Sequence, residues 1–192
     1  MSKAYTGIFT LPNLLTFYRL LLAPLLYLSL AEGMRDVCLL VFLLSAASDV
    51  ADGLLARRLD QVSDFGKMID PVADKLTYFF ILLGLCRQNP EMTMLLIVLI
   101  VKESLCSITS LLAIRSSERI RGARLHGKIN ACVLFLTVLL QLTPLSSHLT
   151  LRYVSIALSI LTMIISCFFY VKEHIETIRH SDVKSITDLI KK

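Results

Sequence analysis

Residues 48–75 read SDVADGLLARRLDQVSDFGKMIDPVADK and lie between two apolar runs, VCLLVFLLSAA (37–47) and LTYFFILLGLC (76–86). The segment contains four aspartates close to these runs: Asp49, Asp52, Asp70 and Asp74. An unpaired charge is costly within a lipid bilayer, and acidic residues in such places usually have a functional role. The segment therefore decides both the class of protein and the position of its site.

The composition is that of a membrane protein. Of the 192 residues, 55% are hydrophobic and only 18% are charged, against roughly 25% charged in a soluble domain. The length suits a single domain, 1–192. The net charge of +5 is weak evidence for nucleic acid in a protein of this class, and we expect no nucleic-acid partner. The composition predicts an all-α, polytopic membrane protein.

Six apolar segments are long enough to cross a hydrocarbon core of about 30 Å as helices. They are 11–31, 36–58, 67–86, 92–114, 127–145 and 150–172. Residues 1–10 form a juxtamembrane segment. Residues 173–192 carry apolar side chains at helical spacing and predict an amphipathic cytosolic tail.

Lysine and arginine are distributed unequally between the two sides of the predicted spans. Fourteen lie on one side: Lys3, Arg57, Arg58, Lys67, Arg115, Arg119, Arg121, Arg124, Lys128, Lys172, Arg179, Lys184, Lys191 and Lys192. The other side carries only Arg35, Arg87 and Arg152. Because cytoplasmic loops are enriched in positive charge, both termini are predicted to be cytoplasmic.

With this orientation the four aspartates lie at similar depths. At 1.5 Å per residue, Asp49 and Asp52 are about 21 and 25 Å below the outer end of their span. Asp70 and Asp74 are about 6 and 12 Å above the inner end of theirs. Each pair, three or four residues apart, shares one helix face. The sequence predicts a carboxylate cluster open to the cytosol.

Small residues continue these faces toward the cytosol and would leave a slot beneath the carboxylates: Gly53, Ala56 and Gly66. Four close carboxylates cannot all stay ionised without cations. Lysine and arginine could supply part of the charge, but oxygen ligands at this density suit Mg²⁺ or Mn²⁺. Two such ions are a common arrangement for attack at phosphorus. The alternatives are aspartates that cap helices or pair with nearby basic residues, and a small cation transporter.

The spacing D-x2-D-G-x2-A-R-x8-G-x3-D-x3-D, which covers 49–74, resembles the signature of the CDP-alcohol phosphatidyltransferases. The resemblance implies transfer of a phosphatidyl group from a CDP-linked lipid to an alcohol, with release of CMP. It implies that Asp49, Asp52 and Asp70 bind two metal ions, and that Asp74 is the general base and lies near the second ion. It also implies a homodimer.

The resemblance extends to nucleotide binding. It implies that Gly53 and Ala56 let the cytidine lie against the helix, and that Arg57 and Ser63 contact the CDP group. Near the N-terminus, Asn13, Thr16 and Arg19 recur on one helix face. Asn13 and Arg19 are candidates to lie near the CDP phosphates; the alternative for Arg19 is snorkelling toward the lipid headgroups.

Two shorter stretches, DPVADK (70–75) and LPNLLTFYRLLLAP (11–24), resemble the phosphatidylglycerophosphate synthases and the cardiolipin synthases that use CDP-diacylglycerol. The resemblance implies a bacterial cytoplasmic membrane protein with sn-glycerol 3-phosphate as acceptor, or phosphatidylglycerol in the alternative. A phosphorylated acceptor needs a cationic partner. The candidates are Arg115, Lys128 and Lys102.

Overall fold

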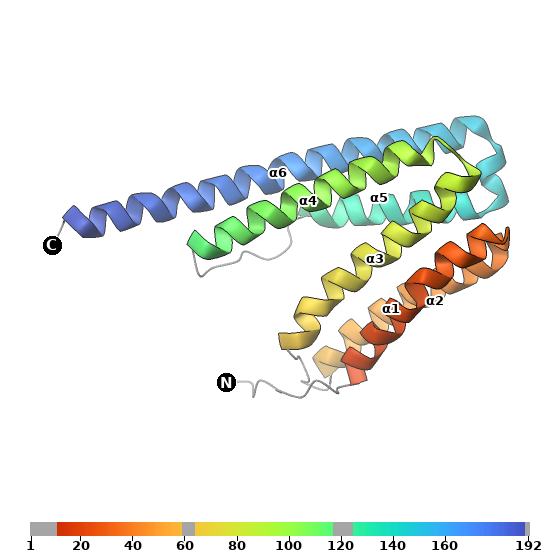
Figure 1. Cartoon of the computed structure of the whole chain (residues 1–192), viewed down its shortest axis with the longest axis horizontal. Coiled ribbons are helices and arrows are strands. Elements are labelled where there is room, and N and C mark those ends of the chain that lie inside the picture. Colours follow the sequence, from red (N-terminus) through yellow and green to blue (C-terminus); the bar gives the residue numbers. More distant parts are fainter. Residues whose placement is uncertain (1–10, 59–63, 117–124, 191–192) are drawn as a thin grey trace. The chain divides into compact units, whose positions relative to one another are not determined.

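The computed structural model describes residues 11–58, 64–116 and 125–190, and within these ranges it is helical, with no strand (Figure 1). The elements are α1 (Leu11–Ala31), α2 (Arg35–Arg58), α3 (Asp64–Gln88), α4 (Met92–Ser116), α5 (Leu125–Leu142), the short 3₁₀ helix η1 (Pro144–Ser147) and α6 (Leu149–Ile190). The prediction of an all-α protein is confirmed.

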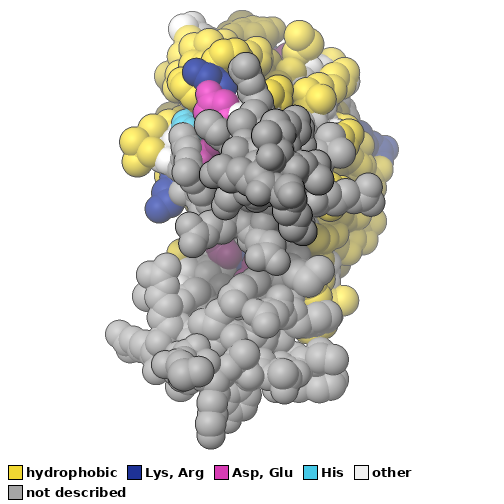
Figure 2. Space-filling model, turned by 90° about the vertical axis from the view of Figure 1, so that its left-hand side faces the viewer, with side chains coloured by type: hydrophobic (Ala, Val, Ile, Leu, Met, Phe, Trp, Pro, Cys, Tyr) yellow, Lys and Arg dark blue, Asp and Glu magenta, His cyan; other side chains and the backbone are white. Residues whose placement is uncertain are grey.

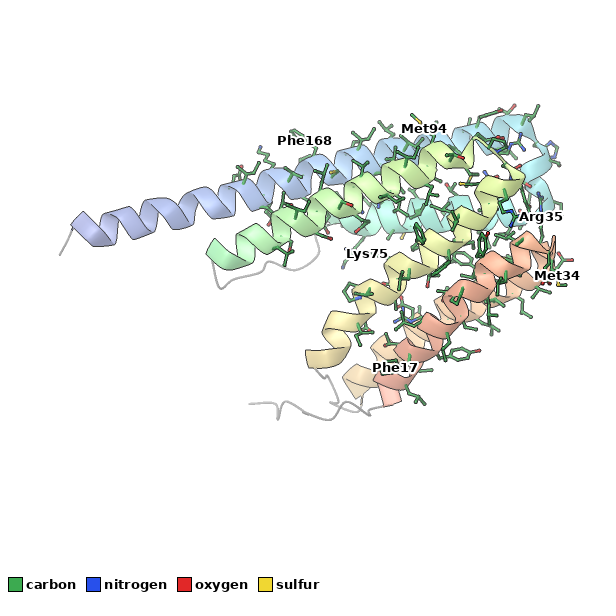
Figure 3. All side chains as sticks on the ribbon, in the orientation of Figure 1. Phe17, Met34, Arg35, Lys75, Met94 and Phe168 are labelled. Carbon is green, nitrogen blue, oxygen red and sulfur yellow. The ribbon has the colours of Figure 1, made fainter. Side chains whose placement is uncertain are left out.

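Four helices are long and apolar enough to cross a membrane, among the residues described: α1, α4, α5 and α6. Hydrophobic side chains predominate among the residues drawn in colour in Figure 2. Met94 on α4 and Phe168 on α6 are 61% and 64% exposed and point away from their helices in Figure 3. The apolar exterior indicates an integral membrane protein. Helices α2 and α3 carry the aspartates and several basic residues, which lowers their hydropathy.

The last helix is longer than a membrane span requires. It runs from Leu149 to Ile190 without a break, 42 residues, or about 63 Å at 1.5 Å per residue. Its sequence contains no glycine or proline, so nothing in it interrupts the backbone hydrogen bonds. Residues 173–190, predicted as an amphipathic tail, therefore continue the helix formed by 149–172.

The helices form two compact units, and the first contains α1, α2 and α3 together with residues 138–146. Helix α1 packs against both α2 and α3. The core is aliphatic: Leu26, Leu30, Ile81, Leu82 and Leu85 are at most 2% exposed. The chain turns from α1 into α2 at Gly33, whose φ of 77° lies in the left-handed region that glycine tolerates.

The second unit contains residues 94–137 and 147–192, and polar side chains join its helices α5 and α6. The hydroxyls of Thr137 and Ser159 are 2.7 Å apart, and Thr137 also donates to the backbone carbonyl of Ser155 at 3.1 Å. Both hydroxyl-bearing side chains are at most 2% exposed. Such bonds between helices stabilise packing where lipid offers no hydrophobic driving force.

Close packing of α1 on α3 depends on Gly84. A Cβ atom there would lie 2.8 Å from Cδ1 and 3.0 Å from Cβ of Leu30. We expect Gly84→Val to destabilise the protein by about 1–3 kcal/mol, as overpacking does in cores. Thermal unfolding in detergent measures the change. Ala157→Val on the exposed face of α6 is the control and should leave the melting temperature nearly unchanged.

The double variant Gly84→Val, Leu30→Ala identifies the cause. Because alanine removes Cδ1 of Leu30, the nearer of the two atoms, the loss in the double variant should be smaller than the sum of the two single losses. Additive losses would contradict a direct contact between the two positions.

Candidate active site

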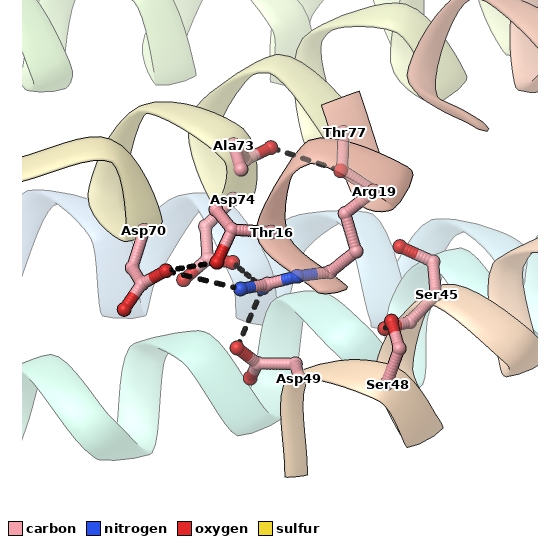
Figure 4. Close-up of polar contacts among 9 residues, drawn as sticks. All are labelled: Thr16, Arg19, Ser45, Ser48, Asp49, Asp70, Ala73, Asp74 and Thr77. Atoms are coloured by element: carbon pink, nitrogen blue, oxygen red, sulfur yellow. Dashed lines mark hydrogen bonds and ion pairs between the residues drawn. The ribbon is translucent and has the colours of Figure 1, made fainter. Parts of the chain in front are cut away.

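Arg19 is the centre of the polar site in the first unit. Its side chain is only 2% exposed, and its Nη1 atom lies 2.5 Å from Oδ1 of Asp49 and 2.5 Å from Oδ1 of Asp74. Its Nη2 atom lies 3.6 Å from Oδ1 of Asp70. Figure 4 shows one guanidinium between carboxylates from α2 and α3. The structure thus brings together three of the four aspartates for which the sequence predicts a common layer.

Thr16 lies almost one turn before Arg19 on α1 and joins the same site. Its hydroxyl donates to Oδ1 of Asp70 at 2.6 Å, and the side chain is 2% exposed. Thr16 therefore orients Asp70 while the guanidinium contacts the same carboxylate. The sequence places Thr16 on the helix face of Arg19, and this three-residue spacing was the available signal for a contact that was not predicted.

The position of Arg19 tests the alternative that it snorkels toward the lipid headgroups. A snorkelling arginine extends its charged end toward water or headgroups, whereas this guanidinium is buried among carboxylates. The snorkelling alternative is wrong, because three nearby negative charges attract the guanidinium inward more strongly than a distant interface does.

The charge of the site is not balanced by Arg19 alone. One guanidinium faces three carboxylates, and the side chains of Asp49, Asp70 and Asp74 are 49%, 44% and 49% exposed. Their accessible oxygens are hard ligands of the type that Mg²⁺ and Mn²⁺ prefer. The donor set and its excess negative charge fit a divalent cation.

In their described positions, these side chains do not surround a single metal ion. Within this part of the chain, no three Asp, Glu, His or Cys side chains are grouped as ligands of one ion. The guanidinium of Arg19 fills the space between Asp49 and Asp74. A cation held between Asp49 and Asp74 by these same oxygens would require the guanidinium to move.

Neighbouring hydroxyl groups are bonded within their own helices. Ser48 donates to the carbonyl of Ser45 at 2.8 Å, and Thr77 donates to the carbonyl of Ala73 at 2.9 Å (Figure 4). In these bonds the two hydroxyls donate to backbone carbonyls and not to the neighbouring aspartates. The aspartates remain available to Arg19, Thr16 and ligands.

Several predicted site residues have side chains outside the described part of the structure. Those with a described helical backbone are Asn13, Asp52, Gly53, Ala56, Arg57, Gly66 and Arg115. Ser63 lies outside the described residues altogether. Their assignments stay predictions.

The acceptor candidates of the second unit differ in their surroundings. Lys102 forms an ion pair with Glu103, its neighbour in the sequence, at 2.6 Å. The long lysine side chain bends back to its neighbour, so its charge is already partnered. Lys128 is exposed near the start of α5.

The start of α5 packs closely on α6. The ring of His126 stacks on that of Phe169, with centroids 5.1 Å apart and an angle of 29°. A Cβ atom at Gly127 would overlap the hydroxyl of Tyr170. Glycine beside Lys128 therefore allows this approach of the helices without displacing the Tyr170 side chain.

The sequence matches the family described as CDP-alcohol phosphatidyltransferase over residues 9–170. The chain belongs to the CDP-alcohol phosphatidyltransferase family. The match includes the whole of 49–74 and both compact units up to Tyr170. The resemblance drawn from the aspartate spacing is confirmed.

Individual relatives carry two kinds of name. An Aquifex aeolicus protein named CDP-diacylglycerol--glycerol-3-phosphate 3-phosphatidyltransferase is 44% identical over 92 residues, 45% of this chain and 51% of that protein. A Streptomyces coelicolor protein named cardiolipin synthase (CMP-forming) is 38% identical over 104 residues, 51% of this chain and 48% of that protein. The chain thus spans about half the length of these two relatives.

A third relative aligns more extensively. A Mycobacterium tuberculosis protein named probable phosphatidylglycerophosphate synthase is 30% identical over 168 residues. These residues make up 84% of this chain and 79% of that protein. The likeness therefore extends well beyond the aspartate segment.

The contact between Thr16 and Asp70 can be tested by stability. Thr16→Val keeps the shape of the side chain but removes the donor, and we expect a loss of about 1 kcal/mol, typical of a buried hydrogen bond. Thr16→Ser keeps the hydroxyl and should retain most of the wild-type stability. Thermal unfolding in detergent measures both. Wild-type stability in Thr16→Val, or a larger loss in Thr16→Ser than in Thr16→Val, would contradict a stabilising role of the hydroxyl.

Proposed function

We propose that the protein transfers the phosphatidyl group of CDP-diacylglycerol to sn-glycerol 3-phosphate, yielding phosphatidylglycerophosphate and CMP. The family match over 9–170 supports the reaction type. The names of the Aquifex and Mycobacterium relatives support this acceptor. The observation that carries the proposal is that Asp49, Asp70 and Asp74 converge on the guanidinium of Arg19.

The carboxylates have distinct roles in this reaction. Asp74 accepts the proton of the attacking hydroxyl, whose oxygen forms the new bond to phosphorus as the bond to CMP breaks. Asp49, Asp52, Asp70 and Asp74 hold two divalent cations, Mg²⁺ or Mn²⁺. When bound, these ions stabilise the negative charge that develops on the pyrophosphate.

The nucleotide end of the lipid lies along the second and third helices. Gly53, Ala56 and Gly66 leave space for the cytidine, because their side chains are small. Arg57 and Ser63 contact the CDP group, and Asn13 and Arg19 approach its phosphates from α1.

The membrane arrangement follows from charge and hydropathy. All six α helices span the bilayer, both termini and the active site face the cytosol, and the residues after 172 extend into the cytosol. The excess of lysine and arginine on one side supports this orientation. We place the protein in a bacterial cytoplasmic membrane as a homodimer.

A cardiolipin synthase is the second candidate. The Streptomyces relative bears that name, and phosphatidylglycerol would then replace glycerol 3-phosphate as acceptor. The first reading is favoured by the Mycobacterium relative, whose alignment covers more of both chains. The family match supports a transferase over a cation transporter.

The proposed metal chemistry predicts strong effects at the aspartates. Asp49→Asn, Asp52→Asn, Asp70→Asn and Asp74→Asn should each reduce CMP release at least about a hundredfold, since charge stabilisation and base catalysis each supply such factors. Removing divalent cations with EDTA should abolish activity, and Mg²⁺ or Mn²⁺ should restore it. Full CMP release by the purified protein in EDTA would contradict the two-metal mechanism.

The acceptor is tested at the cationic positions. Lys128→Ala and Arg115→Ala should each raise the apparent KM for glycerol 3-phosphate about tenfold, the loss expected for one charged contact. Saturation by CDP-diacylglycerol should be nearly unchanged. The control is Lys172→Ala, an exposed lysine that faces Glu176 on α6.

The product distinguishes the two acceptors. Cardiolipin formed from phosphatidylglycerol, with no product from glycerol 3-phosphate, would contradict the proposed acceptor and leave the metal chemistry intact.

A further inference from the structure

Arg19 contacts two carboxylates, Asp49 and Asp74, that would hold a divalent cation in the proposed function. Its Nη1 atom is 2.5 Å from one carboxylate oxygen of each residue, on two different helices. A divalent ion that bridged the same oxygens would need contacts of about 2.0–2.1 Å for Mg²⁺. The nitrogen and the ion cannot occupy this space together.

From this overlap we propose that Arg19 is an exchangeable counter-cation. It holds the carboxylates in the metal-free protein, leaves them when a divalent cation binds, and then contacts the anionic phosphates of the CDP-linked lipid. The proposal rests on the proposed metal-dependent function, and it adds that one side chain couples metal binding to substrate binding.

Burial and charge support an exchange of this kind. Arg19 is 2% exposed, so its guanidinium cannot be left without an anionic partner at low cost. Its planar fork binds a phosphate as well as a carboxylate. A phosphate group brought to the cluster therefore offers the displaced guanidinium an equivalent partner.

The contacts of Asp70 make the exchange local. Thr16 donates to Asp70 at 2.6 Å, whereas the guanidinium is 3.6 Å from the same oxygen. Asp70 keeps its hydroxyl donor when Arg19 moves. Of the ion pairs described for Arg19, the two shorter ones, to Asp49 and Asp74, are exchanged for contacts to metal.

The exchange predicts opposite effects of one substitution on two ligands. In Arg19→Gln, Mn²⁺ should bind at least about tenfold more tightly, because the ion no longer has to break a charge-assisted hydrogen bond. CDP, measured in saturating Mn²⁺, should bind about tenfold more weakly, because its phosphates lose a charged partner. Mn²⁺ binding is followed by electron paramagnetic resonance and CDP binding by calorimetry, on the full chain in detergent.

Two further variants separate the exchange from other causes. Arg19→Lys keeps the charge but loses the fork, so Mn²⁺ affinity should lie between those of wild type and Arg19→Gln. Wild-type affinity in Arg19→Lys would indicate a general charge effect and overturn the exchange. Arg87→Gln alters an exposed arginine that bonds Tyr27, and should change neither ligand.

Thermal unfolding provides a readout that is independent of catalysis. In EDTA, Arg19→Gln should melt below the wild type, and Mn²⁺ should raise its melting temperature more than it raises that of the wild type. Unchanged or weaker Mn²⁺ binding in Arg19→Gln would overturn the displacement, and unchanged CDP binding would overturn the transfer to phosphate. If the wild-type protein released no CMP while Mn²⁺ binding changed as expected in Arg19→Gln, the result would count against the proposed function and not against the displacement.

Discussion

The site depends on the attraction between one buried guanidinium and carboxylates from two other helices. Asp49 and Asp74 lie at 2.5 Å from the same nitrogen of Arg19, although they are separated by the whole aspartate segment. Without a cation between them, their helices would repel one another. Arg19 therefore stabilises the packing of α1 on α2 and α3 as well as the arrangement of the site.

The aliphatic core and the polar cluster have complementary roles in this unit. Leu30 and Gly84 bring α1 and α3 together at one end through close packing, while Thr16 and Arg19 join the same two helices near the other end. Packing fixes the spacing of the helix axes. The polar contacts then fix which faces meet, because an unsatisfied carboxylate between helices is costly.

Much of the fold could be predicted from sequence because it depends on local patterns. The span predicted at 11–31 coincides with α1, and that at 92–114 ends two residues before α4 does. Apolar runs and the residues that interrupt them determine such boundaries. The continuation of α6 beyond 172 was harder to foresee, because its change from apolar to polar composition does not require a break in the backbone.

The contacts of the site were less predictable than its composition. Spacing alone placed Asp49, Asp70 and Asp74 in one layer, because helical rise and periodicity are fixed. That Arg19 turns inward, and that Thr16 donates to Asp70, depends on which helix faces which. The bend of Lys102 to Glu103 depends on side-chain rotamers. The periodicity of one helix does not determine which other helix it faces or which rotamers its side chains adopt.

The excess negative charge explains why this cluster suits a reaction better than a purely structural role. One guanidinium faces three carboxylates, whose side chains are 44–49% exposed. A structural cluster would gain stability from neutral replacements, because partly buried like charges repel. Natural proteins keep such destabilising groups where activity needs them. Among the described side chains, the carboxylates outnumber the guanidinium that contacts them. Such a cluster favours ligands that bring positive charge and, beside these ligands, an anionic group.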